Sequence, residues 1–338
     1  MLNALSKANV INEAENLTTL TRSLFLLRFR DAFATPKSVS SRTEHPPDAR
    51  RLGQEGEHMD APEDTVQLII AESERLTQYL TTLPPEAWST PSACERWEVR
   101  DVVAHLAIAT EVYTDVIARS VQGDASPPAG RQWSGPTTAA AFAEDTAQRV
   151  LARRENLGDQ VLANFLTANA QLHPLLASLG PADWDKPHYT PLGSAPLRHI
   201  PADWLLELVV HGWDIRSRLE SDAHLSEASV PVLVEVSLGR ACRWRFQPGP
   251  RLPTPIRYRV ALTGGDTTEY DIVVAGDQAT VEPAGTAVAH VLLRCDPETF
   301  VLLMLGRLPL ADALAQRRLM AEGAREQVSA FAQWFRGA

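Results

Sequence analysis

The hydrophobic pattern of this chain changes its period once, and that change limits what the chain can fold into. Before the Pro-rich stretch PGPRLPTP at residues 248–255, apolar residues recur at spacings of three and four. After it, apolar and polar residues alternate over short runs that end in Gly-containing turns. The first spacing is typical of amphipathic helices and the second of half-buried strands. The sequence therefore predicts a helical half followed by a smaller half that contains a sheet.

The helical half contains four long helical patterns within the predicted domain 62–222. They cover residues 63–83, 99–121, about 158–179 and about 201–219, and a short Ala-rich segment precedes the third. Pro84-Pro85 ends the first pattern, because proline cannot continue a helix. Helices joined by modest loops favour an antiparallel four-helix bundle, an architecture that builds metal sites from facing side chains.

The second half, residues 225–338, begins with a predicted helix over about 227–244. Three strands are predicted from IRYRVALTG, TEYDIVVAG and AHVLLRC. Helices then return at Asp296-Pro297, where Asp suits the cap and Pro the first helical position, and a last helix covers about 325–335. We expect a small α+β domain here.

The composition of the chain limits which binding partners and which cellular compartment are expected. The net charge of −10 argues against nucleic acid or an anionic membrane as the main partner, and no apolar run approaches the roughly 18 residues of a membrane span. Three widely spaced cysteines predict neither a disulfide framework nor a metal knuckle, which favours the reducing cytoplasm. Residues 1–58 hold eight Lys/Arg and seven Asp/Glu, and their polar, Pro-containing end predicts a disordered extension. Monomer and small homo-oligomer both stay open.

The fourth helical pattern carries charge on a mostly apolar segment, LLELVVHGWDIRSRL. Glu207 and His211 lie one turn apart, and Asp203 and Asp214 extend the same stripe. Residues four apart on a helix differ by about 40° in direction and about 6 Å in height, so their side chains can converge on one ion. A buried carboxylate also needs a positive partner. A divalent metal would satisfy both conditions, although a histidine in a helix is more often an ordinary core residue.

A third ligand is predicted on the second helix. His105 lies in the apolar run VVAHLA, where an unpaired imidazole would be poorly placed. Two histidines and Glu207 form a three-ligand set with an open position, as in catalytic zinc sites, and imidazole favours zinc or another borderline metal over magnesium or calcium. Asp101 and Asp214 are the predicted partners that orient the two histidines. No catalytic acid or base is identified.

Two motifs connect this site with a known family. STPSACERWEVRDVVAHLA and LLELVVHGWDIRSRL resemble the mycothiol-dependent maleylpyruvate isomerase family, which belongs to the DinB-like metal-binding bundles. The stretch HVLLRCDPETFVLLMLGRLPLADALAQRRLMAEG resembles the sterol-carrier-like domain attached to these enzymes. The resemblance covers about residues 62–336 and puts the family's metal ligands at His105, Glu207 and His211. Arg96 and Glu98 depart from it, since glycine and a Thr or Ser cap are frequent there.

The resemblance implies a metal- and mycothiol-dependent enzyme that acts on a small acidic electrophile. A thiolate could add to an activated double bond and leave again, which is cis–trans isomerisation, or displace a leaving group, which is thiol transfer. Arg307, in LGRLPL, is the candidate for binding a substrate carboxylate. Two alternatives stay open: a non-enzymatic small-molecule-binding protein with a structural metal, and a metal-dependent hydrolase that uses a metal-bound water.

Overall fold

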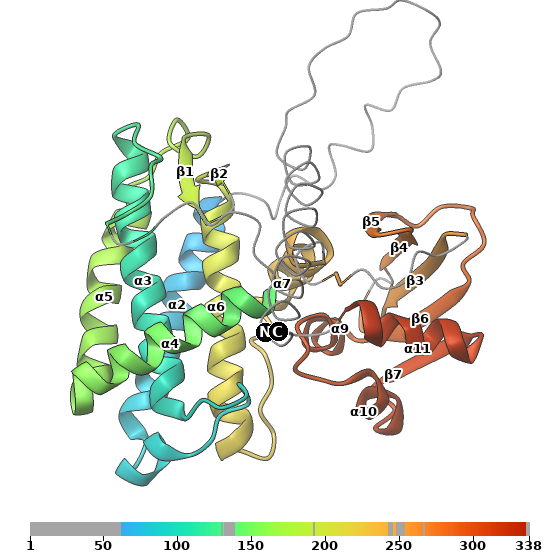
Figure 1. Ribbon diagram of the computed structural model, residues 1–338, viewed down its shortest axis with the longest axis horizontal. Coiled ribbons are helices and arrows are strands. Elements are labelled where there is room, and N and C mark those ends of the chain that lie inside the picture. The colour runs from blue at the N-terminus through green and yellow to red at the C-terminus, as the bar shows by residue number, and fades with distance from the viewer. Residues whose placement is uncertain are drawn as a thin grey trace, which may run out of the picture.

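The computed structural model describes residues 62–129, 131, 139–191, 193–242, 246–247, 254–265 and 268–335. The predicted disordered extension, residues 1–58, lies outside the described residues. A helical part and a part built on a sheet stand beside each other, with α7 between them (Figure 1). The predicted combination of a helical N-terminal region and a C-terminal sheet domain is confirmed.

Long helices build the first part: α2 (Pro62–Thr82), α3 (Val99–Val121), α4 (Ala139–Leu157), α5 (Val161–Ala177) and α6 (His199–Leu219). Helix α3 packs against α5 and α6, and α2 packs against α6 and α5. The core between them contains Ile69, Leu106, Phe165 and Trp204, each fully buried. The 3-10 helix Pro85–Ser89 follows α2, at the Pro-Pro pair that the sequence places there.

The start of α3 is fixed by its own side chains. The Glu98 backbone N–H donates to Asp101 Oδ2 at 2.9 Å, which closes one half of a capping box. Glu98 thus occupies the N-cap position, where the resemblance led us to expect a Thr or Ser. Since α3 carries His105, this cap fixes the register of a candidate ligand.

Two elements of the helical part differ from the prediction. The Ala-rich segment is the full helix α4, whose described side chains include one fully buried hydrophobic residue, Val150. Such a polar helix has too weak an apolar stripe to be identified by its period. A short hairpin, β1 (Pro187–Thr190) with β2 (Gly193–Pro196), lies between α5 and α6. Four-residue strands are too short to give a clear alternation.

The segment between the two parts is a helix with a local change of winding. Helix α7 (Val230–Val236) passes into a π-helical turn, Ser237–Ala241. The single helix predicted over about 227–244 thus begins later, at Val230, and is less regular than expected, and the end of the predicted helix lies outside the described residues.

The second part is a five-stranded sheet in the order β5-β4-β3-β6-β7. Its strands are β3 (Ile256–Leu262), β4 (Thr268–Ala275), β5 (Gln278–Pro283), β6 (Val291–Cys295) and β7 (Leu319–Gly323). Strands β3 and β6 are parallel, and the other neighbouring pairs are antiparallel. Strands β5 and β7 were not predicted, because each is an edge strand with mostly exposed side chains.

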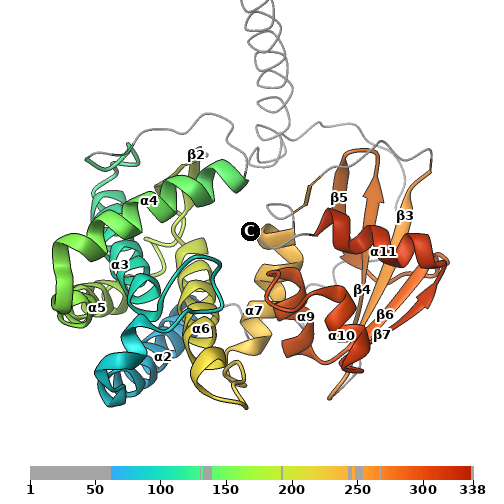
Figure 2. The ribbon, with the colours of Figure 1, turned by 60° about the horizontal axis from the view of Figure 1, so that its bottom comes forward.

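Helices α9 (Pro297–Met304), α10 (Leu310–Ala315) and α11 (Arg325–Trp334) lie on one side of this sheet (Figure 2). The ring of Tyr258 on β3 meets Phe331 of α11 edge-on, with ring centroids 5.1 Å apart. Asp296 caps α9 as predicted, because its carboxylate accepts a hydrogen bond from the Thr299 backbone N–H at 2.8 Å. Among the described residues, no helix combines the length and apolar character needed to cross a membrane.

Candidate metal site

Two helices bring the three predicted ligands together. His105 comes from α3, and Glu207 and His211 come from α6. Glu207 Oε2 lies 3.1 Å from His105 Nε2 and 3.2 Å from His211 Nε2. One ligand atom from each residue lies within 4.8 Å of the other two. Asp203, one turn before Glu207, does not belong to this cluster.

The cluster is enclosed on the histidine side and open at the carboxylate. The side chains of His105 and His211 are 15% and 11% exposed, whereas that of Glu207 is 38% exposed. Burial lowers the pKa of His105. Burial acts to raise the pKa of Glu207, but hydrogen bonds with both histidines outweigh it and hold this pKa well below its usual range. Glu207 is therefore a carboxylate that a small molecule or an ion can reach.

His211 is held from its other nitrogen. Its Nδ1 lies 2.9 Å from Asp214 Oδ2, so Nδ1–H donates to the carboxylate and Nε2 faces Glu207. Burial lowers the pKa of His211, but Cys94, Asp214 and Glu207 together raise it well above its ordinary value. The predicted orienting contact between Asp214 and His211 is present in the structure.

Asp101 does not contact His105 in the way the sequence suggested. Its carboxylate accepts from the Glu98 backbone N–H, and its Oδ1 lies 3.1 Å from Arg154 Nε of α4. Asp101 is nearly fully buried there. The prediction that Asp101 orients His105 is corrected: this residue caps α3 and anchors α4. One turn of helix separates Asp101 from His105 along the axis, but the carboxylate points back to the cap.

The side chain of Arg307 reaches the site, where its hydrogen bonds go to Asp214 and to the Leu305 carbonyl. Its Nε and Nη2 donate to Asp214 Oδ1 and Oδ2 at 3.0 and 2.8 Å, and its Nη1 donates to the Leu305 carbonyl at 3.1 Å. The contacts with Asp214 and Leu305 engage three of the five N–H donors of this guanidinium. The predicted role of Arg307 as a substrate-binding group stays a prediction. Sequence reasoning had no means to pair residues 93 positions apart.

The loop before α3 supplies two further residues that the sequence analysis did not place in the site. Trp97 lies against both histidines, with ring centroids 5.2 Å from His105 and 6.3 Å from His211. Cys94 Sγ donates to Asp214 Oδ2 at 3.0 Å. Arg96 adopts φ 67°, the left-handed region in which a glycine is unstrained. The stretch Cys-Glu-Arg-Trp at residues 94–97, within the first motif that resembles the family, was the available signal, since its Cys and Trp both reach the site.

A second group of potential ligands shares His211. Cys94, His211 and Asp214 also bring one ligand atom each within 4.8 Å. The Arg307 guanidinium already neutralises Asp214 from 2.8 Å, and a cation placed there would meet that positive charge. The His105–Glu207–His211 group has no such competitor and fits a metal better.

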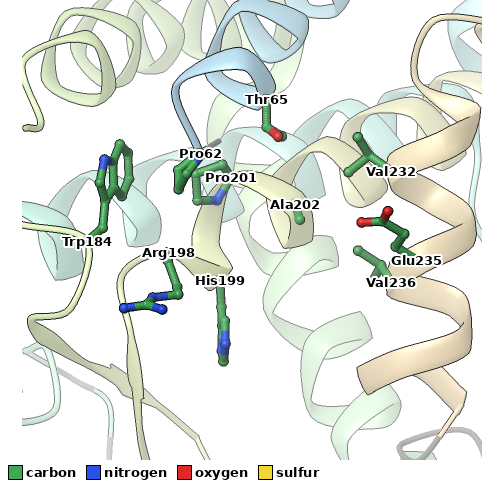
Figure 3. A pocket seen from close by; sticks show the side chains of 10 residues that line it. All are labelled: Pro62, Thr65, Trp184, Arg198, His199, Pro201, Ala202, Val232, Glu235 and Val236. Carbon is green, nitrogen blue, oxygen red and sulfur yellow. The ribbon is translucent and has the colours of Figure 1, made fainter. Parts of the chain in front are cut away.

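A separate cavity of about 400 Å³ opens between the starts of α2 and α6 and one side of α7 (Figure 3). Arg198 and His199 lie on one side of it, and Glu235 of α7 lies on the other. None of the residues of the metal cluster lines this cavity. The cluster and the cavity are therefore distinct features of the described chain.

Comparisons with known proteins agree with both halves of the fold. Residues 70–216 match the mycothiol maleylpyruvate isomerase N-terminal domain family, and residues 256–336 match the SCP-2 sterol transfer family. The crystal structure of the mycothiol-dependent maleylpyruvate isomerase is similar, with 15% identity, a TM-score of 0.51, and coverage of 73% of this chain and 90% of that one. The crystal structure of a mutant of that enzyme is also similar, with 14% identity, a TM-score of 0.53, and coverage of 78% of this chain and 93% of that one. A comparison with curated proteins found no match.

The two family matches confirm the predicted resemblance for both halves of the chain. At these identities the crystal structures show a shared fold. They extend over both the helical part and the sheet part, since each covers more than two thirds of this chain.

Proposed function

From the match of its helical half to the mycothiol maleylpyruvate isomerase N-terminal domain family, we propose that this protein is a metal- and mycothiol-dependent enzyme. It acts on a small acidic electrophile, by cis–trans isomerisation or by thiol transfer, in the reducing cytoplasm. The observation that carries the proposal is the convergence of His105, Glu207 and His211 from two helices.

The proposed metal is zinc, held by His105, Glu207 and His211. Two imidazoles and one carboxylate suit this borderline cation, and three protein ligands leave one coordination position open. The donor set fits, because one carboxylate oxygen lies 3.1 and 3.2 Å from the two Nε2 atoms. When bound there, the cation would favour the thiolate form of a thiol at neutral pH.

The protein's own residues prepare this site. Asp214 accepts the Nδ1 proton of His211, so Nε2 is the nitrogen that would give up its proton and bind the metal. The indole of Trp97 packs beside the rings of both histidines. Because the side chain of Glu207 is more exposed than those of His105 and His211, substrates would approach past Glu207.

The proposed reactions need little general acid–base catalysis by the protein's own side chains. When a thiolate adds to one carbon of an activated C=C bond, a C–S bond forms and the C=C bond becomes a single bond that can rotate. The thiolate then leaves with the electron pair of the C–S bond, and the double bond forms again. Isomerisation of this kind is redox-neutral, so it needs no further cofactor. Thiol transfer differs only in that a leaving group departs from the electrophile instead of the thiol.

The proposal includes an antiparallel four-helix bundle over residues 62–222, made by α2, α3, α5 and α6, and a second domain over residues 225–338. The packing of α3 on α5 and α6, and of α2 on α6, supports the bundle. The separate family match of residues 256–336 supports the division.

A second candidate function comes from the C-terminal half. Its match to the SCP-2 sterol transfer family favours binding of an apolar small molecule without catalysis. The proposed metal would then be structural. The two functions differ in their response to a chelator, since ligand binding by the sheet domain would survive removal of the metal.

The test is an isomerisation or conjugation assay with mycothiol and a panel of small acidic electrophiles. We expect turnover that needs both thiol and metal, that stops on chelation, and that returns with zinc. A His211→Ala variant should be inactive with or without added zinc. Turnover without thiol would refute the thiol-dependent mechanism, and ligand binding that persists without turnover would favour the second function.

A further inference from the structure

One buried carboxylate in this molecule receives donors from three separate segments of the chain. Asp214 on α6 is fully buried. Its Oδ2 accepts from His211 Nδ1 at 2.9 Å, from Cys94 Sγ at 3.0 Å and from Arg307 Nη2 at 2.8 Å. Its Oδ1 accepts from Arg307 Nε at 3.0 Å. The loop before α3, the ligand-bearing helix and the C-terminal half therefore meet at this one group.

Arg307 reaches Asp214 from a tight turn after α9. Gly306 adopts φ 70°, which favours glycine, and the Arg307 backbone N–H donates to the Leu302 carbonyl at 2.8 Å. The Arg307 side chain is only 10% exposed, and its Nη1 is tied to the Leu305 carbonyl. The turn thus holds the guanidinium in a fixed direction, pointing out of the C-terminal half.

The pairing explains how α6 tolerates Asp214. A buried carboxylate needs a positive partner, and a bidentate arginine satisfies both of its oxygens. Without the guanidinium, one oxygen of Asp214 would have no partner among the contacts described here, and the side chain could turn. The imidazole ring of His211 would then lose its fixed orientation, because its Nδ1–H donates to the same carboxylate.

We propose that Arg307 is a positioning residue of the metal site, and that the C-terminal half sets the metal affinity of the helical half through it. Arg307 acts through Asp214, which fixes the ring of His211 so that Nε2 faces Glu207. The inference rests on the proposed function, because it takes His211 as a metal ligand. Coupling of this kind is reciprocal, so metal binding in turn favours docking of the C-terminal half.

The chain offers a matched control at the same interface. His224, in the segment after α6, lies 3.1 Å from Glu298 on α9. This pair also joins the two halves, but neither residue contacts a proposed metal ligand in the structure described. Glu298→Gln therefore weakens an interdomain contact without touching Asp214.

The experiment measures the zinc affinity of the purified full chain by competition with a chromophoric chelator. We expect Arg307→Met to weaken zinc binding about 10-fold, the lower end of the effect of losing the direct partner of a metal ligand, because Arg307 acts through Asp214. Arg307→Lys should recover part of the loss, since it keeps the charge but not the two parallel bonds. Glu298→Gln should bind zinc as the wild type does. The visible spectrum of the cobalt(II)-loaded protein should change in Arg307→Met and not in Glu298→Gln.

The outcomes separate this inference from the proposed function. Wild-type protein that binds no zinc overturns both. Wild-type protein that binds zinc, with Arg307→Met unchanged in affinity and spectrum, overturns the inference and leaves the proposed function standing. If Arg307→Met fails to fold, Arg307→Lys decides the question, and wild-type affinity in that variant contradicts the positioning role.

Discussion

The most direct prediction concerns the change in melting temperature that zinc causes. At free zinc about 100 times above Kd, a single site adds about 2.7 kcal/mol to the stability of the folded state. For a domain of this size that corresponds to a rise of roughly 5–10 °C. His105→Ala leaves Glu207 and His211, both on α6, as the remaining ligands. If affinity falls about 100-fold, the same zinc concentration adds only about 0.4 kcal/mol.

The assay is differential scanning calorimetry of each variant with and without zinc, so that each variant serves as its own reference. The cavity left by His105→Ala lowers both melting temperatures and cancels in the difference. His173→Ala is the matched control, because His173 on α5 is half-buried and bonds Ser73 Oγ at 3.1 Å, outside the cluster. His173→Ala should keep the full zinc-induced rise. If His105→Ala also keeps it, zinc binds elsewhere and the site assignment is wrong.

Three further predictions test the local structure by urea or thermal unfolding. Arg96→Gly should stabilise the protein by about 0.5–1 kcal/mol, because glycine adopts the left-handed φ of 67° without strain, and a loss of stability would contradict this. Hydrogen bonding to Glu298 raises the pKa of His224, so its stabilising effect is fully present below about pH 6.5 and is lost as pH rises through the raised pKa. A difference in melting temperature between wild type and His224→Gln that does not depend on pH would contradict that. Asp296→Ala should cost about 1 kcal/mol by removing the cap of α9, whereas Asp312→Ala at an exposed site of α10 should change stability by less than about 0.5 kcal/mol.

The residues that sequence reasoning brought together share a local signal. Glu207 and His211 lie four apart on one helix, and His105 is a polar residue in an apolar run, so periodicity alone marks all three. Their convergence from α3 and α6 followed from the expectation of packed helices. The division of the fold into a helical half and a half with a sheet was also predictable, because each hydrophobic period continues over many residues.

The contacts that were missed lack such a local signal. Arg307 and Asp214 are 93 positions apart, and Cys94 and Asp214 are 120 apart, so only the folded chain pairs them. Strands β5 and β7 were missed because an edge strand with exposed side chains has no apolar alternation. Asp101 was misassigned because spacing gives the face of a helix but not the direction of a side chain at its first turn.

Two carboxylates on α6 show how the surroundings assign roles to similar groups. Glu207 and Asp214 are seven residues apart, so they lie on the same face of the helix, and His211 contacts both. Asp214 is fully buried and its charge is balanced by Arg307, which together with His211 holds the pKa of Asp214 well below its usual range against the effect of burial. Glu207 is 38% exposed and meets only two imidazoles, whose positive charge depends on protonation. A cation that enters this site therefore gains most beside Glu207, where the negative charge is reachable and has no permanent partner. The same comparison supports the proposal that Asp214 orients His211 and is not itself a metal ligand.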